Sequence, residues 1–182
     1  ITSTLLGQIL YVGIMVIIFT AYLLLFRRDY FDKPRSIAML YVLLTLFPVV
    51  LSLFMRHNFI SVYIIPFAMV PMFVRVLMDS RTAFTTHVIM VMICAAAVKY
   101  QYEFIIIQLT AGFVAIYSLR ELLRRAQVFK TALLVAVSSV VVYLSLQMMQ
   151  DNDFMKMDHE MNVHFAVNGV LLLLAYPLMY II

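Results

Sequence analysis

The sequence predicts an all-α integral membrane protein, a bundle of seven transmembrane helices with the N-terminus outside and the C-terminus in the cytoplasm. Composition gives the class: 65% of the 182 residues are hydrophobic and only 12% are charged, whereas soluble domains are nearer half apolar and a quarter charged. Long apolar runs alternate with short polar connectors, and most Lys and Arg residues fall in every second connector. The runs and the cations together predict the number of spans and their orientation.

A helix needs about 20 largely apolar residues to cross the hydrocarbon core, with roughly 17 to 25 tolerated. Charged or polar breaks divide the chain into seven such runs, at about 4–26, 37–54, 59–78, 82–99, 104–119, 131–149 and 164–182. Because the runs are continuously apolar and do not alternate with period two, helices are favoured over a barrel. Residues 1–182 then form one transmembrane domain. Since the chain starts without Met and stops inside an apolar run, we interpret it as excised from a longer protein.

The first three spans differ in their prolines. Residues 4–26 contain none, and Pro48 predicts a kink in the second span because it removes a backbone donor. Pro66 and Pro71 lie together in IIPFAMVPMF of the third span, so we expect this helix to be kinked or interrupted. Broken membrane helices sometimes build binding sites, but no midspan acid or base accompanies these prolines.

The boundary between the third and fourth spans carries Arg75, Asp79 and Arg81. Arg75 precedes Asp79 by four residues, so the two side chains can pair at the inner membrane boundary. His87 follows about one turn into the fourth span. An ionisable group inside a membrane is a functional candidate by default, but a neutral imidazole bonded to a neighbouring helix is the alternative. Cys94 is the single cysteine, which excludes an intrachain disulfide.

The fifth to seventh spans are continuous apolar runs, the last of which contains Pro177 as a further expected kink. His159 and His164 lie in DHEMNVH before the seventh span. The metalloprotease pattern needs two His residues four apart on one helix face, and here the spacing is five. An external metal or pH-sensing site and a solvated acidic loop both remain open for this segment.

The distribution of Lys and Arg gives the orientation, because cytoplasmic connectors are enriched in these residues. Ten cations fall on one side and three on the other. The ten are Arg27, Arg28, Lys33, Arg35, Arg75, Arg81, Arg120, Arg124, Arg125 and Lys130, and the three are Arg56, Lys99 and Lys156. The bias places the N-terminus outside, and an odd number of spans then places the C-terminus in the cytoplasm.

The basic cluster of Arg120, Arg124, Arg125 and Lys130 is first a topology determinant, because each cation costs about 2.5 to 3.5 kcal/mol to insert at a helix centre. Its apolar residues also fall on one helical stripe, which predicts a short interfacial helix on anionic headgroups. Docking of a cytoplasmic domain is the second possible role. The unequal distribution of Lys and Arg across the membrane accounts for the positive net charge, so no nucleic-acid partner is predicted.

The chain lacks the motifs of several function classes. It has no glycine-rich phosphate loop, no chain of membrane-embedded acids for proton pumping, and no Lys in the seventh span for a retinal Schiff base. It also has no His-Asp doublet, the minimal mark of an HD phosphohydrolase. We therefore predict no catalytic residue, no cofactor and no metal on this chain.

Two segments, PFAMVPMFVRVLMDSRTAF and QLTAGFVAIYSLRELLRRAQVFKTALLVA, resemble the membrane region of the bacterial seven-transmembrane HD family. The matching positions are Pro66, Asp79, Arg81, Ala83, Gly112, Arg120, Arg125 and Pro177. The resemblance covers most of the chain, but its motifs are ones of spacing rather than chemistry. It implies a receptor-like protein of the bacterial inner membrane, with an extracellular domain and a cytoplasmic HD domain that holds two metal ions and hydrolyses cyclic-di-AMP.

We accordingly expect a sensor or anchor module of such a signalling protein, one that can also form homo-oligomers. The alternative is a small transporter or channel that uses the helix broken at Pro66 and Pro71. The first hypothesis predicts altered hydrolysis in the full-length protein when the helices are mutated. The second predicts substrate flux through the isolated membrane region.

Overall fold

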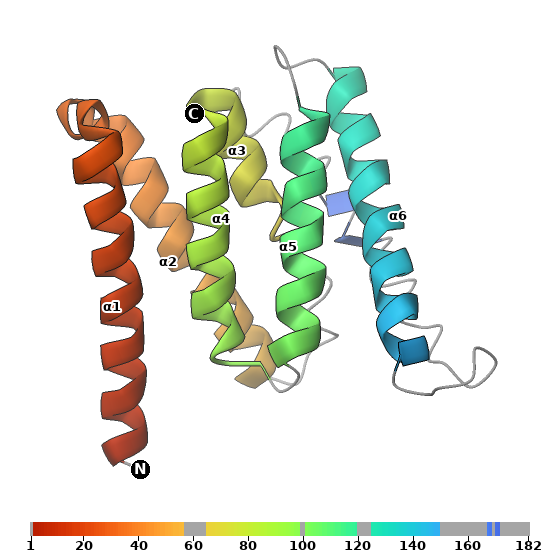
Figure 1. The fold of residues 1–182 in the computed structure, drawn as a ribbon, viewed down its shortest axis with the longest axis horizontal. Coiled ribbons are helices and arrows are strands. Elements are labelled where there is room, and N and C mark those ends of the chain that lie inside the picture. The colour runs from red at the N-terminus through yellow and green to blue at the C-terminus, as the bar shows by residue number, and fades with distance from the viewer. Residues whose placement is uncertain are drawn as a thin grey trace.

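The computed structural model describes residues 2–56, 65–98, 101–119, 125–149, 167, 168, 170 and 171. Within this part of the chain the regular structure is helical and contains no strand, so the predicted all-α class is confirmed (Figure 1). The elements are α1 (Thr2–Phe26), the 3-10 helix η1 (Arg28–Asp32), α2 (Pro34–Arg56), α3 (Met69–Leu77), α4 (Ser80–Ala95), α5 (Gln101–Ser118) and α6 (Arg125–Met149).

Three of the helices are long and apolar enough to cross a membrane: α1, the Pro34–Leu53 part of α2, and the Phe129–Met149 part of α6. They correspond to the predicted spans at 4–26, 37–54 and 131–149. Helix α4 is apolar but only 16 residues long, and α5 has 18 residues. Four residues of the predicted span at 164–182 are described, and they are helical. The full set of seven spans stays a prediction.

The third predicted span, 59–78, is not one continuous helix. Its described part starts with turns over 65–68, in which the N–H of Met69 donates to the carbonyl of Pro66. Helix α3 then has nine residues, or about 14 Å at 1.5 Å per residue, well short of the hydrocarbon core. Pro71 lies in its first turn, where a missing backbone donor costs no helical hydrogen bond. Within the predicted span 59–78, helix α3 thus begins only at Met69, between Pro66 and Pro71.

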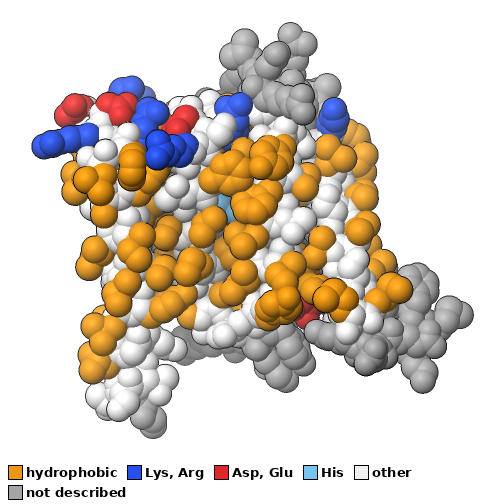
Figure 2. Space-filling model, in the orientation of Figure 1, with side chains coloured by type: hydrophobic (Ala, Val, Ile, Leu, Met, Phe, Trp, Pro, Cys, Tyr) orange, Lys and Arg blue, Asp and Glu red, His pale blue; other side chains and the backbone are white. Residues whose placement is uncertain are grey.

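The short helices lie inside the bundle and the long ones outside. Helix α4 contacts α1, α2, α3 and α5, and Met69–Val74 of α3 are all buried. Helix α1, by contrast, buries only Phe19 and Leu23 and exposes Leu, Ile and Val side chains along its length. Hydrophobic side chains are spread over the middle of the face in Figure 2. An exposed apolar surface of this extent is typical of contact with lipid.

One end of the bundle contains η1, the turn between α3 and α4, and the start of α6 (Figure 1). Lys and Arg side chains gather along the same edge in Figure 2. Residues 125–130 belong to α6 and continue without a break into its apolar part. We expected a separate interfacial helix across residues 120–130. Residues 120–124 lie outside the described part of the chain, and the described part, 125–130, contains no Gly or Pro to separate it from the rest of α6.

Candidate functional site

The main cluster of polar contacts begins at Asp79, which caps the N-terminus of α4. Its backbone is extended, with φ −143° and ψ 167°, and its Oδ2 accepts a hydrogen bond of 3.4 Å from the N–H of Thr82. Aspartate is a favoured N-cap because it satisfies one of the free N–H groups of the first turn. The positive end of the helix dipole also stabilises its negative charge.

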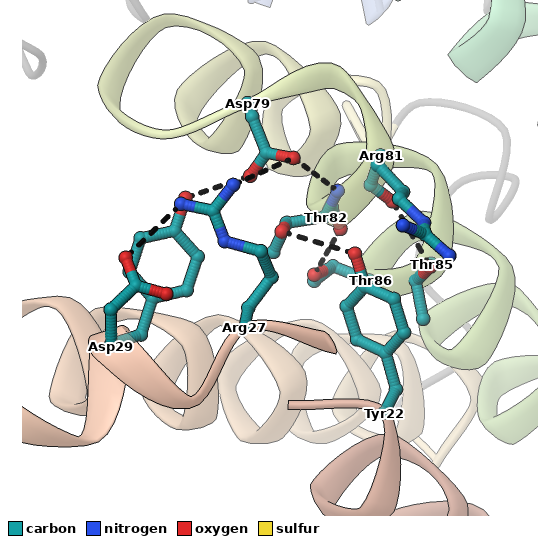
Figure 3. A network of polar contacts seen from close by, with 9 residues as sticks. Tyr22, Arg27, Asp29, Asp79, Arg81, Thr82, Thr85 and Thr86 are labelled. Carbon is teal, nitrogen blue, oxygen red and sulfur yellow. Dashed lines mark hydrogen bonds and ion pairs between the residues drawn. The ribbon is translucent and has the colours of Figure 1, made fainter. Parts of the chain in front are cut away.

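The segment after α1 brings Arg27 to the same carboxylate (Figure 3). Tyr30 binds this carboxylate too. The Tyr30 hydroxyl donates to Oδ1 of Asp79 at 2.7 Å, and Nη1 of Arg27 lies 3.7 Å from Oδ2. Arg27 also pairs with Asp29 at 3.2 Å, and its guanidinium lies over the Tyr30 ring at 4.4 Å. We call Arg27, Tyr30, Asp79 and Thr82 the junction network.

The hydroxyl bond is the stronger link of this network. The Arg27 and Asp79 side chains are 31% and 28% exposed, and partly exposed ion pairs contribute about 0–1 kcal/mol. A short hydrogen bond to a charged acceptor contributes about 1.5–3 kcal/mol. Tyr30 is also 95% buried, because its exposed fraction is 5%. Tyr30 therefore holds η1 onto α4 more firmly than Arg27 does.

The protonation states follow from these contacts. Burial by itself would raise the pKa of the Asp79 carboxyl, but the hydrogen bonds from Thr82 and Tyr30 and the charge of Arg27 outweigh burial and lower it. Burial, followed by the hydrogen bond to Asp79, raises the pKa of Tyr30. At neutral pH the network therefore consists of a carboxylate that accepts and a phenol that donates.

A second set of contacts ties the last turn of α1 to the first turn of α4. The Tyr22 and Thr82 hydroxyls are 3.3 Å apart, and the Arg81 guanidinium lies 4.4 Å from the centre of the Phe26 ring. Such cation–π contacts contribute about 0.5–1 kcal/mol at exposed sites. Together with the junction network, they fix α1, η1 and α4 relative to one another at the basic end.

Asp79 pairs with Arg27, a partner that the four-residue spacing of Arg75 and Asp79 did not predict. Helix α3 ends at Leu77, and Met78 leaves helical geometry with φ −132° and ψ −111°. The four-residue spacing brings two side chains together only along a continuous helix. Asp79 accordingly turns toward η1.

His87 is fully buried, and its Nε2 lies 2.7 Å from the carbonyl oxygen of Gln108 in α5. Because a carbonyl only accepts, Nε2 carries the proton. Nδ1 has no hydrogen-bond partner in the described part of the chain, which fits a neutral ring. Of the two interpretations left open by the sequence, the geometry matches a neutral imidazole bonded to a neighbouring helix.

Several predicted site residues fall outside this cluster. Lys130 is exposed near the start of α6, and Arg125 is the first residue of that helix. Pro48 lies inside α2. Arg120, Arg124, His159, His164 and Pro177 lie outside the described residues. Among the residues that are described, no three His, Cys, Asp or Glu side chains gather in a way that could hold a metal ion.

Sequence reasoning missed Arg27 and Tyr30 as partners of Asp79, because the hydrogen bond spans 49 residues. The only local signal was the N-cap itself: Asp79 begins DSRT, a polar stretch in front of an apolar run. Such a stretch predicts a helix start but not the tyrosine that binds the capping carboxylate. The junction network can position helices, but it contains no nucleophile with an adjacent base.

Comparison with known protein families identifies the family to which the chain belongs. Residues 2–182 match the sequence model of the family described as 7TM receptor with intracellular HD hydrolase. Neither the comparison with curated proteins nor the comparison with solved structures gave a match. The family match covers nearly the whole sequence and agrees with the apolar helices and with the resemblance seen at Pro66, Asp79 and Arg81. The chain is therefore a membrane protein that belongs to the family of 7TM receptors with an intracellular HD hydrolase.

Proposed function

We propose that this chain is the transmembrane sensor or anchor module of a signalling protein in the bacterial cytoplasmic membrane. Seven spans would place the N-terminus outside and the C-terminus in the cytoplasm, next to an HD phosphohydrolase domain. The family match supports the association with an HD hydrolase. The resemblance suggests cyclic-di-AMP as its substrate and two metal ions as the cofactors of that domain, not of this chain.

The observation that carries the proposal is the junction network at the basic end. It links η1, which follows the first span, to the cap of α4, which is the most enclosed helix of the described bundle. The positive-inside bias assigns this end to the cytoplasm. A rearrangement of α1 would therefore reach the cytoplasmic surface through Tyr30 and Asp79, where a soluble domain could respond to it.

The proposed partners follow from the same surface. Exposed Lys33 and Arg35 at the start of α2, and Lys130 at the start of α6, suit contact with anionic headgroups. An extracellular domain, the HD domain and a second copy of the chain are further proposed partners.

The coupling is tested in the full-length protein reconstituted in membranes, by measuring cyclic-di-AMP hydrolysis with manganese present. Tyr30→Phe removes the hydroxyl that holds η1 to Asp79. Tyr102→Phe is the matched control, because Tyr102 is 67% exposed at the start of α5. We expect hydrolysis to change in the first variant and to equal the wild type in the second. Equal activity in all three proteins would reduce the chain to a membrane anchor.

The orientation is tested separately with reporters fused after Ile182. A reporter active only in the cytoplasm should work, and one active only outside should be silent, because ten of the thirteen cations lie on the proposed inner side. The reverse pattern would overturn the seven-span arrangement.

A further inference from the structure

A pocket of about 450 Å³ lies between α1, α2 and α4, at the end of the bundle away from the junction network. Residues from the first turns of α1, the last part of α2 and the end of α4 line it, among them Gln8, Tyr11, Ser52 and Cys94. Its volume falls within the roughly 300–1,000 Å³ typical of small-molecule sites. It is partly open, and its α1 residues lie within the candidate membrane span Thr2–Phe26. Residues of two candidate membrane spans, Thr2–Phe26 and Pro34–Leu53, therefore contribute to its lining.

The wall contributed by α1 is a polar stripe on an apolar helix. Thr4, Gln8 and Tyr11 all line the pocket, and their spacing of four and three residues places them on one helix face. Their neighbours Leu5 and Ile9 are 57% and 60% exposed on the surface that suits lipid. Thr4 and Gln8 are exposed as well, so the two sides of this part of α1 differ in polarity and not in exposure.

Of the polar side chains on this stripe, Tyr11 has a hydrogen-bond partner within the protein and Gln8 has none among the described residues. The Tyr11 hydroxyl donates to the carbonyl of Met92 at 2.6 Å, which closes one side of the pocket. No described residue hydrogen-bonds to the carboxamide of Gln8. Gln8 is exposed and lies in a candidate membrane span, where an amide without a partner is costly, so it favours an occupant that supplies a donor or an acceptor.

The lining also sets the charge and shape of that occupant. Its described lining residues carry hydroxyl, amide and thiol groups next to Val, Leu, Ile, Pro and Ala side chains, and none of these described residues is Asp, Glu, Lys, Arg or His. We propose that this pocket binds a neutral amphiphile from the bilayer, with its hydroxyl or carbonyl end at Gln8 and its apolar part between α2 and α4. The inference deepens the proposed sensor role and rests on it for its consequence, but binding itself can be tested without hydrolysis.

The test uses photoreactive diazirine derivatives of decanol, decanoic acid and decylamine on the protein in lipid nanodiscs, with labelled peptides mapped by mass spectrometry. We expect the alcohol to label residues 4–12 and 93–97 in a saturable manner, and excess unlabelled decanol to compete. The ionised acid and amine should not label these residues saturably, because no described residue of the lining carries a charge. Equal saturable labelling by a charged probe would overturn the neutral class.

Two α1 glycines provide a matched pair of variants. A Cβ added at Gly7 or at Gly13 meets nothing within 4 Å, so neither Phe variant clashes at its first carbon. Only Gly7 lines the pocket. Gly7→Phe should therefore lose saturable labelling, whereas Gly13→Phe should keep it. Labelling that is unchanged in both variants would identify general lipid contact and refute the site.

A third variant guards against misfolding as the cause of lost labelling. Gln8→Leu suits a membrane helix and removes only the hydrogen-bonding group. It should raise the half-saturating concentration of the alcohol about tenfold, as expected for one hydrogen bond. The elution profile and the protection of Cys94 should match those of the wild type. Unchanged half-saturation in this folded variant would contradict the role assigned to Gln8.

Discussion

Replacing Gly112 with alanine is expected to destabilise the contact between α4 and α5. A Cβ at this position would overlap with Cδ2, Nε2 and Cε1 of the His87 ring. Gln108 and Gly112 are four residues apart on one face of α5, so the missing side chain of the glycine is what lets the ring reach the Gln108 carbonyl. The imidazole is rigid and fully buried. It cannot yield to the methyl group without leaving that carbonyl.

The cost can be estimated from these contacts. Overpacking a close-packed core costs about 1–3 kcal/mol, and a lost hydrogen bond costs about 1 kcal/mol. A total of about 2–4 kcal/mol corresponds to a fall in Tm of roughly 4–16 °C for a chain of this size. Cys94 gives the readout: it is the only cysteine and is 1% exposed. A fluorogenic maleimide therefore reports its exposure during heating.

The control is a double-mutant cycle with His87→Ala. Removing the ring leaves space for the new methyl group, so Gly112→Ala should cost much less in that background. An equal fall in Tm in both backgrounds would show that the loss comes from α5 itself. No fall in either background would refute the close contact of Gly112 with His87.

Four further outcomes are expected, and the first three follow from the junction network and the basic cluster. Tyr30→Phe should lower the free energy of unfolding by about 1.5–3 kcal/mol, read by the same thiol assay; no change would contradict the Asp79 bond. Because folding lowers the pKa of Asp79, its stabilisation is present at neutral pH and is lost as pH falls below about 4. Asp79→Asn should abolish that part of the acid sensitivity in melts at several pH values. In the full-length protein, lysine at Arg120, Arg124 and Arg125 should leave insertion normal but change hydrolysis, because only guanidinium pairs bidentately with carboxylates. If the triple lysine variant keeps wild-type activity and regulation, the cluster acts only as a topology signal. Purified residues 1–182 should neither hydrolyse cyclic dinucleotides with manganese nor conduct solutes in liposomes, and either activity would favour a different function.

The sequence by itself determined the all-α membrane class, the family and the positions of the longest helices. These properties depend on local composition. A run such as 4–26 is helical and suited to lipid whatever lies beside it, because every backbone group must be satisfied within the helix. The family match over residues 2–182 likewise depends on the order of residues alone. The prolines at 66 and 71 also predicted an interrupted third span from local chemistry.

Only the tertiary structure decided which side chains meet. The pair of Arg27 and Asp79, the bond from Tyr30, and the contact of His87 with Gln108 join residues that are 21 to 52 positions apart. The four-residue spacing of Arg75 and Asp79 did not reveal Arg27, and α3 ends at Leu77, a helix end that cannot be placed to within one turn from spacing. The pocket beside Gln8 was equally invisible, since a cavity arises from how α1, α2 and α4 diverge. Side-chain type follows from the chain, but the partner of each side chain follows from the packing of helices that are distant in sequence.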